Sequence, residues 1–316
     1  MDVNVYHLGL TSSIPLQTSP KLVMVIGQMR GGSSIVGELF NQYPGSMYFF
    51  EPLRAIGRKK TNDTESLYRN MKGYPVGGDA VSEVMTHLFE CKVTIFSLSV
   101  LKDDFMLRSE KGVNYYRCAN MDSISHKRFQ QCLDTLRDSC YESTIRAVKT
   151  IRLTFDTAER IMTLLPNLKI IYLVRDPRAT IQSRLSLGII NKNSIEEEAK
   201  ELCVRVQKDL EFIKISNKQN NIKVVQYETF AKNVIEGAKN IFDFVGIKMQ
   251  NKVLSFINTH STKSLDLNPF STSRNSVKSV DNWVHKINTV TANIIDKSCD
   301  HLLNNLGYKY FNDIKN

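Results

Sequence analysis

The residues best suited to chemistry lie between Lys21 and Pro52, where an apolar run gives way to glycine, serine and arginine. The run Leu22–Ile26 ends at Gly27, and Arg30-Gly31-Gly32-Ser33-Ser34 then opens an amphipathic segment. This order predicts a strand, a tight turn and a helix start. A helix N-terminus presents unpaired N–H groups and the positive end of a dipole, and glycines let the backbone close on an anion. The loop is therefore predicted to bind phosphate.

The spacing from Gly27 to Gly32 also fits a Walker A frame, but Ser33 stands where that frame needs a lysine. Without that lysine, an ordinary NTPase is disfavoured and another phosphate-containing donor is expected. Two alternatives stay open from the residues alone. One is a P-loop-type kinase of a small molecule, and the other is a nucleotide- or anion-binding module without turnover.

A second junction of the same kind follows the apolar run Leu168–Val174, which stops at Arg175. Asp176 is a good N-cap and Pro177 suits the first helical position, so Arg175 is predicted at the C-terminal end of a buried strand. Ser183 then lies two turns into the following helix. Ligands of open α/β sheets bind beyond the carboxyl ends of the strands, where both junctions are expected to lie.

Glu51 is the candidate general base, because it follows the short apolar run Met47–Phe50 and should emerge at the same sheet edge. Pro52 prevents simple continuation of that strand. The alternative is that Glu51 forms an ion pair with Arg30 or caps a helix. Lys149 and Arg152 are candidates to face the donor or another anionic ligand, and a structural role is equally open for them.

The wider pattern alternates strands with helices, which predicts an α/β fold with a mainly parallel sheet flanked by helices. The expected strands are Leu22–Ile26, Met47–Phe50, Ile145–Thr150, Leu168–Val174 and Ile222–Gln226. The expected helices are Ser33–Tyr43, Asp79–Cys91, Ser125–Ser139, Asp156–Leu164, Pro177–Leu187, Ser194–Gln219, Ala231–Val245 and Ile287–Leu306. Gly57–Gly78 and Leu107–Ser123 are expected to be loops and to carry acceptor specificity.

The paired motifs Gln28–Ser34 and Leu173–Arg184 resemble those of carbohydrate sulfotransferases, which use 3′-phosphoadenosine 5′-phosphosulfate. Further stretches resemble the Golgi 6-O-sulfotransferases of galactose, N-acetylgalactosamine and N-acetylglucosamine; these are Gly37–Asn41, Tyr48–Pro52, Ser271–Ser276 and Trp283. The resemblance implies a P-loop-NTPase-like sulfotransferase fold. It also implies a single domain over residues 21–311, after an N-terminal segment at 1–20 and before a tail at 312–316.

The resemblance further assigns roles to residues of this chain. The donor's 5′-phosphosulfate is expected on Arg30, Gly31, Gly32, Ser33 and Ser34, with Arg30 also catalytic as a stabiliser of developing charge. Its 3′-phosphate is expected on Arg175 and Ser183, with added contacts from Arg274 and Ser276, and Glu51 is expected to be the base.

Three further side chains carry secondary expectations. Arg178 and Arg184 are weaker candidates for donor contacts, with solvated helix charges as the alternative. For Trp283, the only tryptophan, a packing role is preferred to ligand contact.

The expected reaction is in-line transfer of a sulfuryl group to the 6-hydroxyl of a glycan, a glycosaminoglycan among the candidates, and this logic requires no metal. The charge balance fits such partners. The chain has 42 Lys and Arg against 32 Asp and Glu, a formal net charge of +10, which favours anionic ligands such as the donor or an acidic glycan. It lacks long basic runs with interleaved aromatics, so nucleic acid is not an expected partner.

The six cysteines form no C-x-x-C pair and no zinc-type spacing with histidine, so no metal site is expected. They are either buried thiols of a cytosolic protein or, as the resemblance favours, disulfides formed in the Golgi lumen. Their connectivity is open. Met1–Pro20 contains no apolar run that could span a bilayer, so the expectation is a Golgi protein whose anchor is missing from this sequence, with the cytosol as the alternative.

Overall fold

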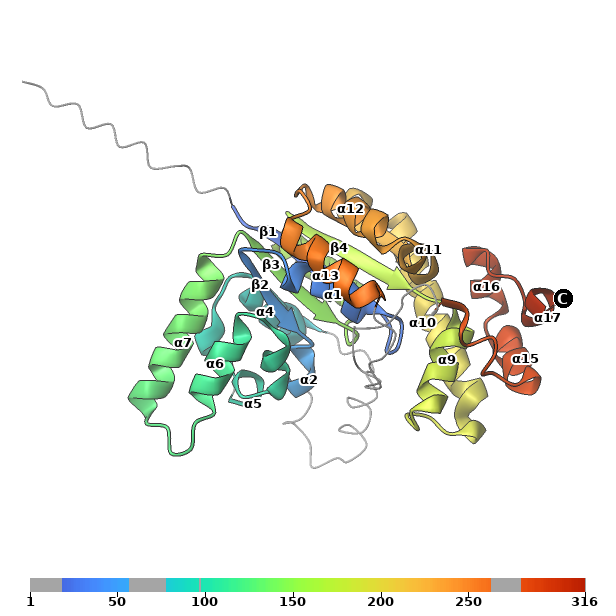
Figure 1. The fold of residues 1–316 in the computed structure, drawn as a ribbon, viewed down its shortest axis with the longest axis horizontal. Coiled ribbons are helices and arrows are strands. Elements are labelled where there is room, and N and C mark those ends of the chain that lie inside the picture. The colour runs from blue at the N-terminus through green and yellow to red at the C-terminus, as the bar shows by residue number, and fades with distance from the viewer. Residues whose placement is uncertain (1–18, 57–77, 97, 263–279, 316) are drawn as a thin grey trace, which may run out of the picture.

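The structure is a computed structural model that describes residues 19–56, 78–96, 98–262 and 280–315 (Figure 1). A five-stranded parallel sheet in the order β2-β3-β1-β4-β5 lies at its centre. The strands are β1 (Lys21–Ile26), β2 (Ser46–Phe50), β3 (Ile145–Thr150), β4 (Leu168–Val174) and β5 (Ile222–Gln226). All five predicted strands are confirmed, and so is the α/β fold class.

The register brings the strand ends that matter for chemistry to one edge of the sheet. Ile26 of β1 pairs with Thr150 of β3, and Phe50 of β2 pairs with Lys149. Because all strands run parallel, the loops that follow β1, β2, β3, β4 and β5 emerge at this carboxyl edge. This is where the sequence placed the phosphate loop, Glu51 and Arg175.

Helices cover the sheet on both sides (Figure 1). Before β3 the main helices are α1 (Ser33–Asn41), α2 (Leu53–Ile56), α4 (Asp79–Phe89), α5 (Leu98–Leu101), α6 (Gly112–Ala119) and α7 (His126–Tyr141), with the 3-10 helices η1 (Val93–Ile95) and η2 (Asp104–Arg108). Between β3 and β5 they are α8 (Phe155–Leu164), α9 (Pro177–Ser186) and α10 (Ile195–Ile215). After β5 they are α11 (Tyr227–Lys232), α12 (Val234–Val245), α13 (Asn251–Thr262), α15 (Thr289–Ser298), α16 (Asp300–Leu306) and α17 (Phe311–Lys315).

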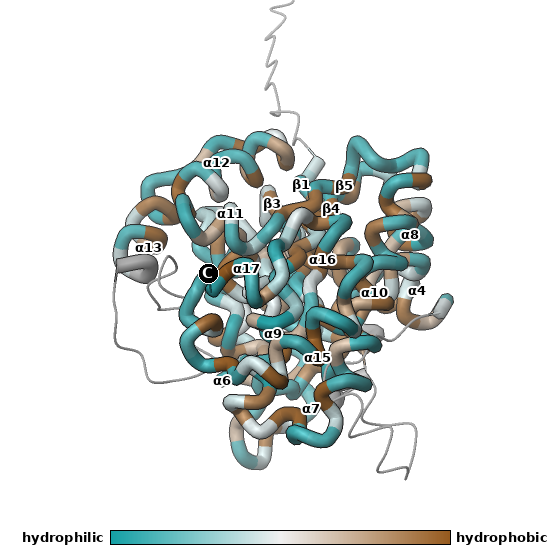
Figure 2. Tube along the Cα trace, turned by 90° about the vertical axis from the view of Figure 1, so that its right-hand side faces the viewer, coloured by the Kyte–Doolittle hydropathy of each residue, from teal (hydrophilic) through white to brown (hydrophobic). Residues whose placement is uncertain are grey.

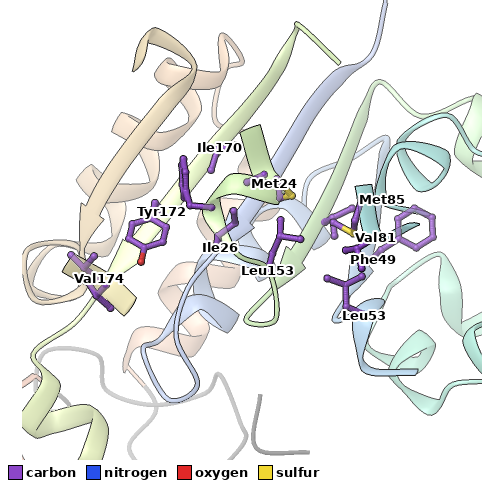
Figure 3. Close-up of a cluster of buried hydrophobic side chains, with 14 of the residues drawn as sticks. Met24, Ile26, Phe49, Leu53, Val81, Met85, Leu153, Ile170, Tyr172 and Val174 are labelled. Carbon is purple, nitrogen blue, oxygen red and sulfur yellow. The ribbon is translucent and has the colours of Figure 1, made fainter. Parts of the chain in front are cut away.

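Alternation along the strands builds two cores. Val23 and Val25 of β1 face a cluster formed with α1, α11, α12 and α13, whereas Met24 and Ile26 face the opposite cluster with α4, α8 and α10. Figure 3 shows the second cluster, where side chains of β1, β2 and β4 meet those of α4. Hydrophobic residues gather on the strands and alternate with hydrophilic ones along covering helices (Figure 2). The sheet is therefore buried on both faces, by one cluster on each side.

Several predicted element boundaries were wrong. Residues 107–123 were expected to be a loop, but they contain the end of η2 and the helix α6. The expected helix over 231–245 is broken at Asn233, whose side chain caps α12 by accepting from the Glu236 N–H. The expected helix over 287–306 is interrupted at Cys299, which separates α15 from α16. Helix α13 was not predicted, and almost all of the expected loop at 57–78 lies outside the described residues.

All six cysteines form disulfides, as the resemblance implied. The pairs are Cys91–Cys140, Cys118–Cys132 and Cys203–Cys299. The first two tie α7 to the turn after α4 and to α6, and the third ties α10 to the junction of α15 and α16. Within the described part of the chain, no helix combines the length and apolar character needed to cross a membrane.

Candidate functional site

A cavity of about 690 Å³ opens at the carboxyl edge of the sheet. Its walls come from the carboxyl ends of all five strands, from α9 and η2, and from the residues around Trp283. Most predicted site residues line it, namely Arg30, Gly32, Ser33, Ser34, Glu51, Arg175 and Ser183. Gly31 belongs to the same loop but does not line the cavity, and Arg274 and Ser276 lie outside the described residues.

The loop after β1 has a backbone that few residues tolerate. Gly32 has φ +91°, and a Cβ there would lie 2.4 Å from the Tyr227 ring, so only glycine fits. Arg30 also has positive φ, at 69°, and the Gly31 N–H donates to the Gln28 carbonyl at 2.8 Å. A left-handed backbone conformation at a non-glycine residue costs of order 1–3 kcal/mol, and residues with this strain are found most often at functional sites.

The N-terminus of α1 points into the same loop. Gly32 is its N-cap and supplies no side-chain acceptor, and no acidic residue occupies the first turn. Ser33 and Ser34 are the first two helical residues and both line the cavity. Their N–H groups and the helix dipole make this end of the cavity suitable for an anion.

The two phosphate motifs are in direct contact, although they are about 150 residues apart. Arg30 Nε donates to Ser183 Oγ at 3.0 Å, and Arg175 Nη1 donates to the Arg30 carbonyl at 3.0 Å. The Arg175 guanidinium lies 4.5 Å from the centre of the Tyr227 ring. One anion-binding end is thus built jointly from the β1 loop, α9 and the residue after β5.

Glu51 lies buried between two cations. Its side chain accepts from Lys149 Nζ at 2.6 Å and forms a second ion pair with Arg152, and all three residues are less than 5% exposed. Glu51 itself has φ 50°. Burial lowers the pKa of Lys149, and the nearby Glu51 carboxylate opposes that shift. Glu51 therefore forms ion pairs with Lys149 and Arg152, whereas the alternative stated from the sequence named Arg30 as its partner.

The start of α9 holds Arg178, one of the two weaker candidates for donor contacts. Asp176 caps the helix as expected, accepting from the Arg178 N–H at 2.8 Å. Arg178 is fully buried, pairs with Asp176 and Asp296, and lies 4.9 Å from the centre of the Trp283 ring. It is therefore neither a solvated charge nor a residue that lines the cavity. Trp283, 7% exposed, packs in the core as preferred, and it also lines the cavity.

Arg184 is likewise buried instead of solvated. It donates to the Met29 carbonyl at 3.3 Å and pairs with Glu198 at 3.4 Å. Its part is to hold the β1 loop against α10.

A series of buried side-chain hydrogen bonds holds Gln28, a residue of the phosphate loop. Gln28 Nε2 donates to Tyr172 Oη at 2.7 Å, and Tyr172 Oη donates to Asp209 Oδ2 at 2.7 Å. Arg205 donates to the Gln28 side-chain oxygen. Burial raises the pKa of Asp209 to about 6, against the opposing effects of the Tyr172 hydroxyl and the Arg205 charge.

Sequence reasoning missed several residues of the cavity, among them Arg54, Phe105, Arg108, Tyr227 and Lys286. Tyr227 directly follows β5, so its position at the carboxyl edge was a usable signal. Among the described lining residues, seven are Lys or Arg and Glu51 is the single carboxylate. The cavity is therefore strongly suited to anions. In the described part of the chain, no group of three or more His, Cys, Asp or Glu side chains is placed to hold a metal ion.

Comparison with known proteins places these features in context. The model of a family described as "Sulfotransferase family" matches residues 20–251. Carbohydrate sulfotransferase 1 of Rattus norvegicus is 25% identical, over 91% of this chain and 79% of its own. Carbohydrate sulfotransferase 3 of Mus musculus is 24% identical, over 92% and 68%. The solved sulfotransferase domain of the Synechococcus PCC 7002 olefin synthase superposes with a TM-score of 0.55 at 16% identity, over 92% and 96%, which shows a shared fold.

Proposed function

The chain belongs to the sulfotransferase family, and on this premise we propose that it transfers a sulfuryl group from 3′-phosphoadenosine 5′-phosphosulfate to the 6-hydroxyl of galactose, N-acetylgalactosamine or N-acetylglucosamine in a glycan. The observation that carries the proposal is the contact between Arg30 and Ser183, because it joins the two phosphate motifs in one basic cavity. The similarity to carbohydrate sulfotransferases 1 and 3 supports a sugar as the acceptor.

The donor's two charged groups have separate supports in the proposal. The 5′-phosphosulfate lies on Arg30 and the N-terminal N–H groups of α1, where the helix dipole favours negative charge. The 3′-phosphate lies against Arg175 and Ser183. Ser183 Oγ accepts from Arg30 and keeps its own O–H to donate to a phosphate oxygen.

The reaction is an in-line displacement at sulfur. The oxygen of the acceptor hydroxyl forms a bond to sulfur while the bond from sulfur to the bridging phosphate oxygen breaks, and 3′-phosphoadenosine 5′-phosphate leaves. Negative charge grows on the bridging oxygen, where Arg30 stabilises it. The hydroxyl proton passes to a carboxylate, for which we propose Glu51.

The ion pairs of Glu51 are compatible with this role. A carboxylate has about four lone-pair sites, and the contacts to Lys149 and Arg152 use one on each oxygen. Glu51 lines the cavity, so a remaining lone pair can accept from a sugar hydroxyl. Lys149 and Arg152 hold the carboxylate in place, and both line the cavity.

The compartment we propose is the Golgi lumen. Three disulfides are expected in an oxidising compartment and are rare in cytosolic proteins. Among oxidising compartments we propose the Golgi because the chain resembles carbohydrate sulfotransferases.

The proposal is tested by incubating the purified chain with sulfur-labelled donor and a panel of galactose-, N-acetylgalactosamine- and N-acetylglucosamine-terminated glycans. Label on the 6-oxygen of a sugar is the expected result, and label on no glycan would refute the proposal.

Glu51→Gln should lower kcat by about 10²- to 10⁴-fold while leaving the affinity for 3′-phosphoadenosine 5′-phosphate unchanged. The matched control is Glu83→Gln, which changes an exposed carboxylate on α4. Unchanged kcat in Glu51→Gln would remove Glu51 as the base.

A further inference from the structure

A second hollow, of about 430 Å³, adjoins the catalytic cavity. Its walls come from α1, from α13 and from residues 107 and 108 at the end of η2. Arg108 lines both the catalytic cavity and this hollow. The two spaces therefore share one wall residue.

The shared wall is fixed by contacts to both helices. Asn41 Nδ2 of α1 donates to the Arg108 carbonyl at 3.0 Å, and Asn41 Oδ1 accepts from the Glu110 N–H at 2.9 Å. On the other side, Lys252 of α13 forms an ion pair with Glu110. These contacts hold the Arg108 backbone between α1 and α13, so the hollow has a defined position relative to the catalytic cavity.

The catalytic side of this wall is aromatic and lies beside the proposed base. The Arg108 guanidinium is 5.2 Å from the centre of the Phe50 ring, and Phe50 directly precedes Glu51. Phe50 and Phe105 pack edge to face with ring centres 5.0 Å apart. A sugar whose hydroxyl reaches Glu51 would lie against these rings, with Arg108 next to its neighbour in the glycan chain.

The chemistry of the hollow suits another sugar. Gln42 offers an amide and Ser255 a hydroxyl group, both at the hollow. One turn further along α13, the Thr259 O–H donates to the Ser255 carbonyl at 2.8 Å, so its oxygen is left to accept. Phe256 and Leu107 add apolar surface between them. A sugar ring presents the same combination, with hydroxyl groups around its edge and C–H groups on its faces.

We propose that this hollow is a distal subsite of the acceptor, which binds a sugar of the same glycan beyond the one that is sulfated. The inference rests on the proposed function and extends it. The chain then acts on an oligosaccharide or polysaccharide in preference to a single sugar or disaccharide. The glycan runs from Glu51 past Arg108 and along α13.

The test measures sulfate transfer to linear acceptors of two, four and six sugars built from alternating galactose and N-acetylglucosamine. The expected kcat/KM rises about tenfold from two sugars to four or six, through KM, because one or two added hydrogen bonds are worth about that much. Ser255→Trp, which fills the hollow with a bulky side chain, should remove this gain and leave turnover of the disaccharide unchanged. Lys239→Trp, at an exposed position on α12, is the matched control and should keep the gain.

Binding of 3′-phosphoadenosine 5′-phosphate by Ser255→Trp, equal to that of the unmodified chain, establishes that the variant is folded. A kcat/KM that does not depend on acceptor length would overturn the distal subsite, and so would a length gain that survives Ser255→Trp. Either result would leave the proposed function intact. Absence of transfer to every one of these acceptors and to every glycan of the galactose, N-acetylgalactosamine and N-acetylglucosamine panel would instead refute the proposed function, and the subsite with it.

Discussion

Asp209 gives a stability prediction that can be worked out from the structure. This carboxyl group is buried beneath the phosphate loop, where it accepts from Tyr172, and its pKa is raised from 3.8 to about 6, chiefly by burial. The folded state therefore holds the proton more tightly than the unfolded chain does. The stabilisation is fully present below pH 3.8 and is lost as the pH rises through about 6.

The size of the effect follows from the two pKa values. At about 1.4 kcal/mol per pH unit, the unmodified chain should lose about 2 to 3 kcal/mol of unfolding free energy between pH 4 and pH 7 on account of this group. Asp209→Asn removes the titrating proton and keeps an oxygen that can accept from the Tyr172 hydroxyl. Between pH 4 and pH 7 the free energy of unfolding of Asp209→Asn should therefore fall by about 2 to 3 kcal/mol less than that of the unmodified chain.

The assay is urea unfolding at pH 4, 5, 6 and 7 with the disulfides intact. Only the difference between the two proteins is read, because every other titrating group is shared by both. Asp122→Asn, which changes an exposed aspartate, is the control and should follow the unmodified chain. Parallel curves for Asp209→Asn and the unmodified chain would refute the reasoning, since Asp209 would then titrate as an exposed carboxyl does.

Three further predictions concern the donor site and the disulfides. Gly32→Ala should abolish measurable binding of 3′-phosphoadenosine 5′-phosphate in calorimetry, because its Cβ would meet the Tyr227 ring at 2.4 Å on a left-handed backbone; retained affinity would contradict the loop geometry. Arg175→Ala should raise the KM for the donor roughly ten- to hundredfold, the value of a charge-assisted contact to phosphate, while an unchanged KM would exclude it from the donor site. Replacing Cys203 and Cys299 together by serine should lower the free energy of unfolding by up to about 4 to 5 kcal/mol, because the bond closes a 96-residue loop, and a melting temperature equal to that of the unmodified chain would show that the bond is dispensable.

The sheet and the phosphate loop were predictable because their signals are local. β1 and β4 are almost wholly apolar runs that end at Gly27 and Arg175, and β3 and β5 are short runs rich in Ile and Val. Parallel pairing then places every strand end at one edge. Gly32 and Asp176 could likewise be interpreted from their own neighbours, as a turn residue and a helix cap. The positions of Glu51 and Arg175 at the cavity follow from the same logic.

The features that could not be predicted depend on partners far away in the sequence. Arg178 looks like a solvated helix charge until Asp296, 118 residues away, is seen to pair with it. The same holds for Glu51, whose partner Lys149 comes from a strand 98 residues further along the chain. Helix α6 was missed because it is eight residues long, and the Cys118–Cys132 bond to α7 supplies a constraint that periodicity does not show.

The central claim is that the cavity holds a nucleotide with a 3′-phosphate beside its 5′-phosphosulfate. The most direct measurement is calorimetric titration of the purified chain with 3′-phosphoadenosine 5′-phosphate, with 5′-AMP and ATP as comparison ligands. Binding of the bisphosphate roughly a hundredfold tighter than that of 5′-AMP is expected, because Arg175 and Ser183 each add a contact to the 3′-phosphate. Equal affinities, or binding of ATP alone, would contradict the assignment and favour the kinase alternative.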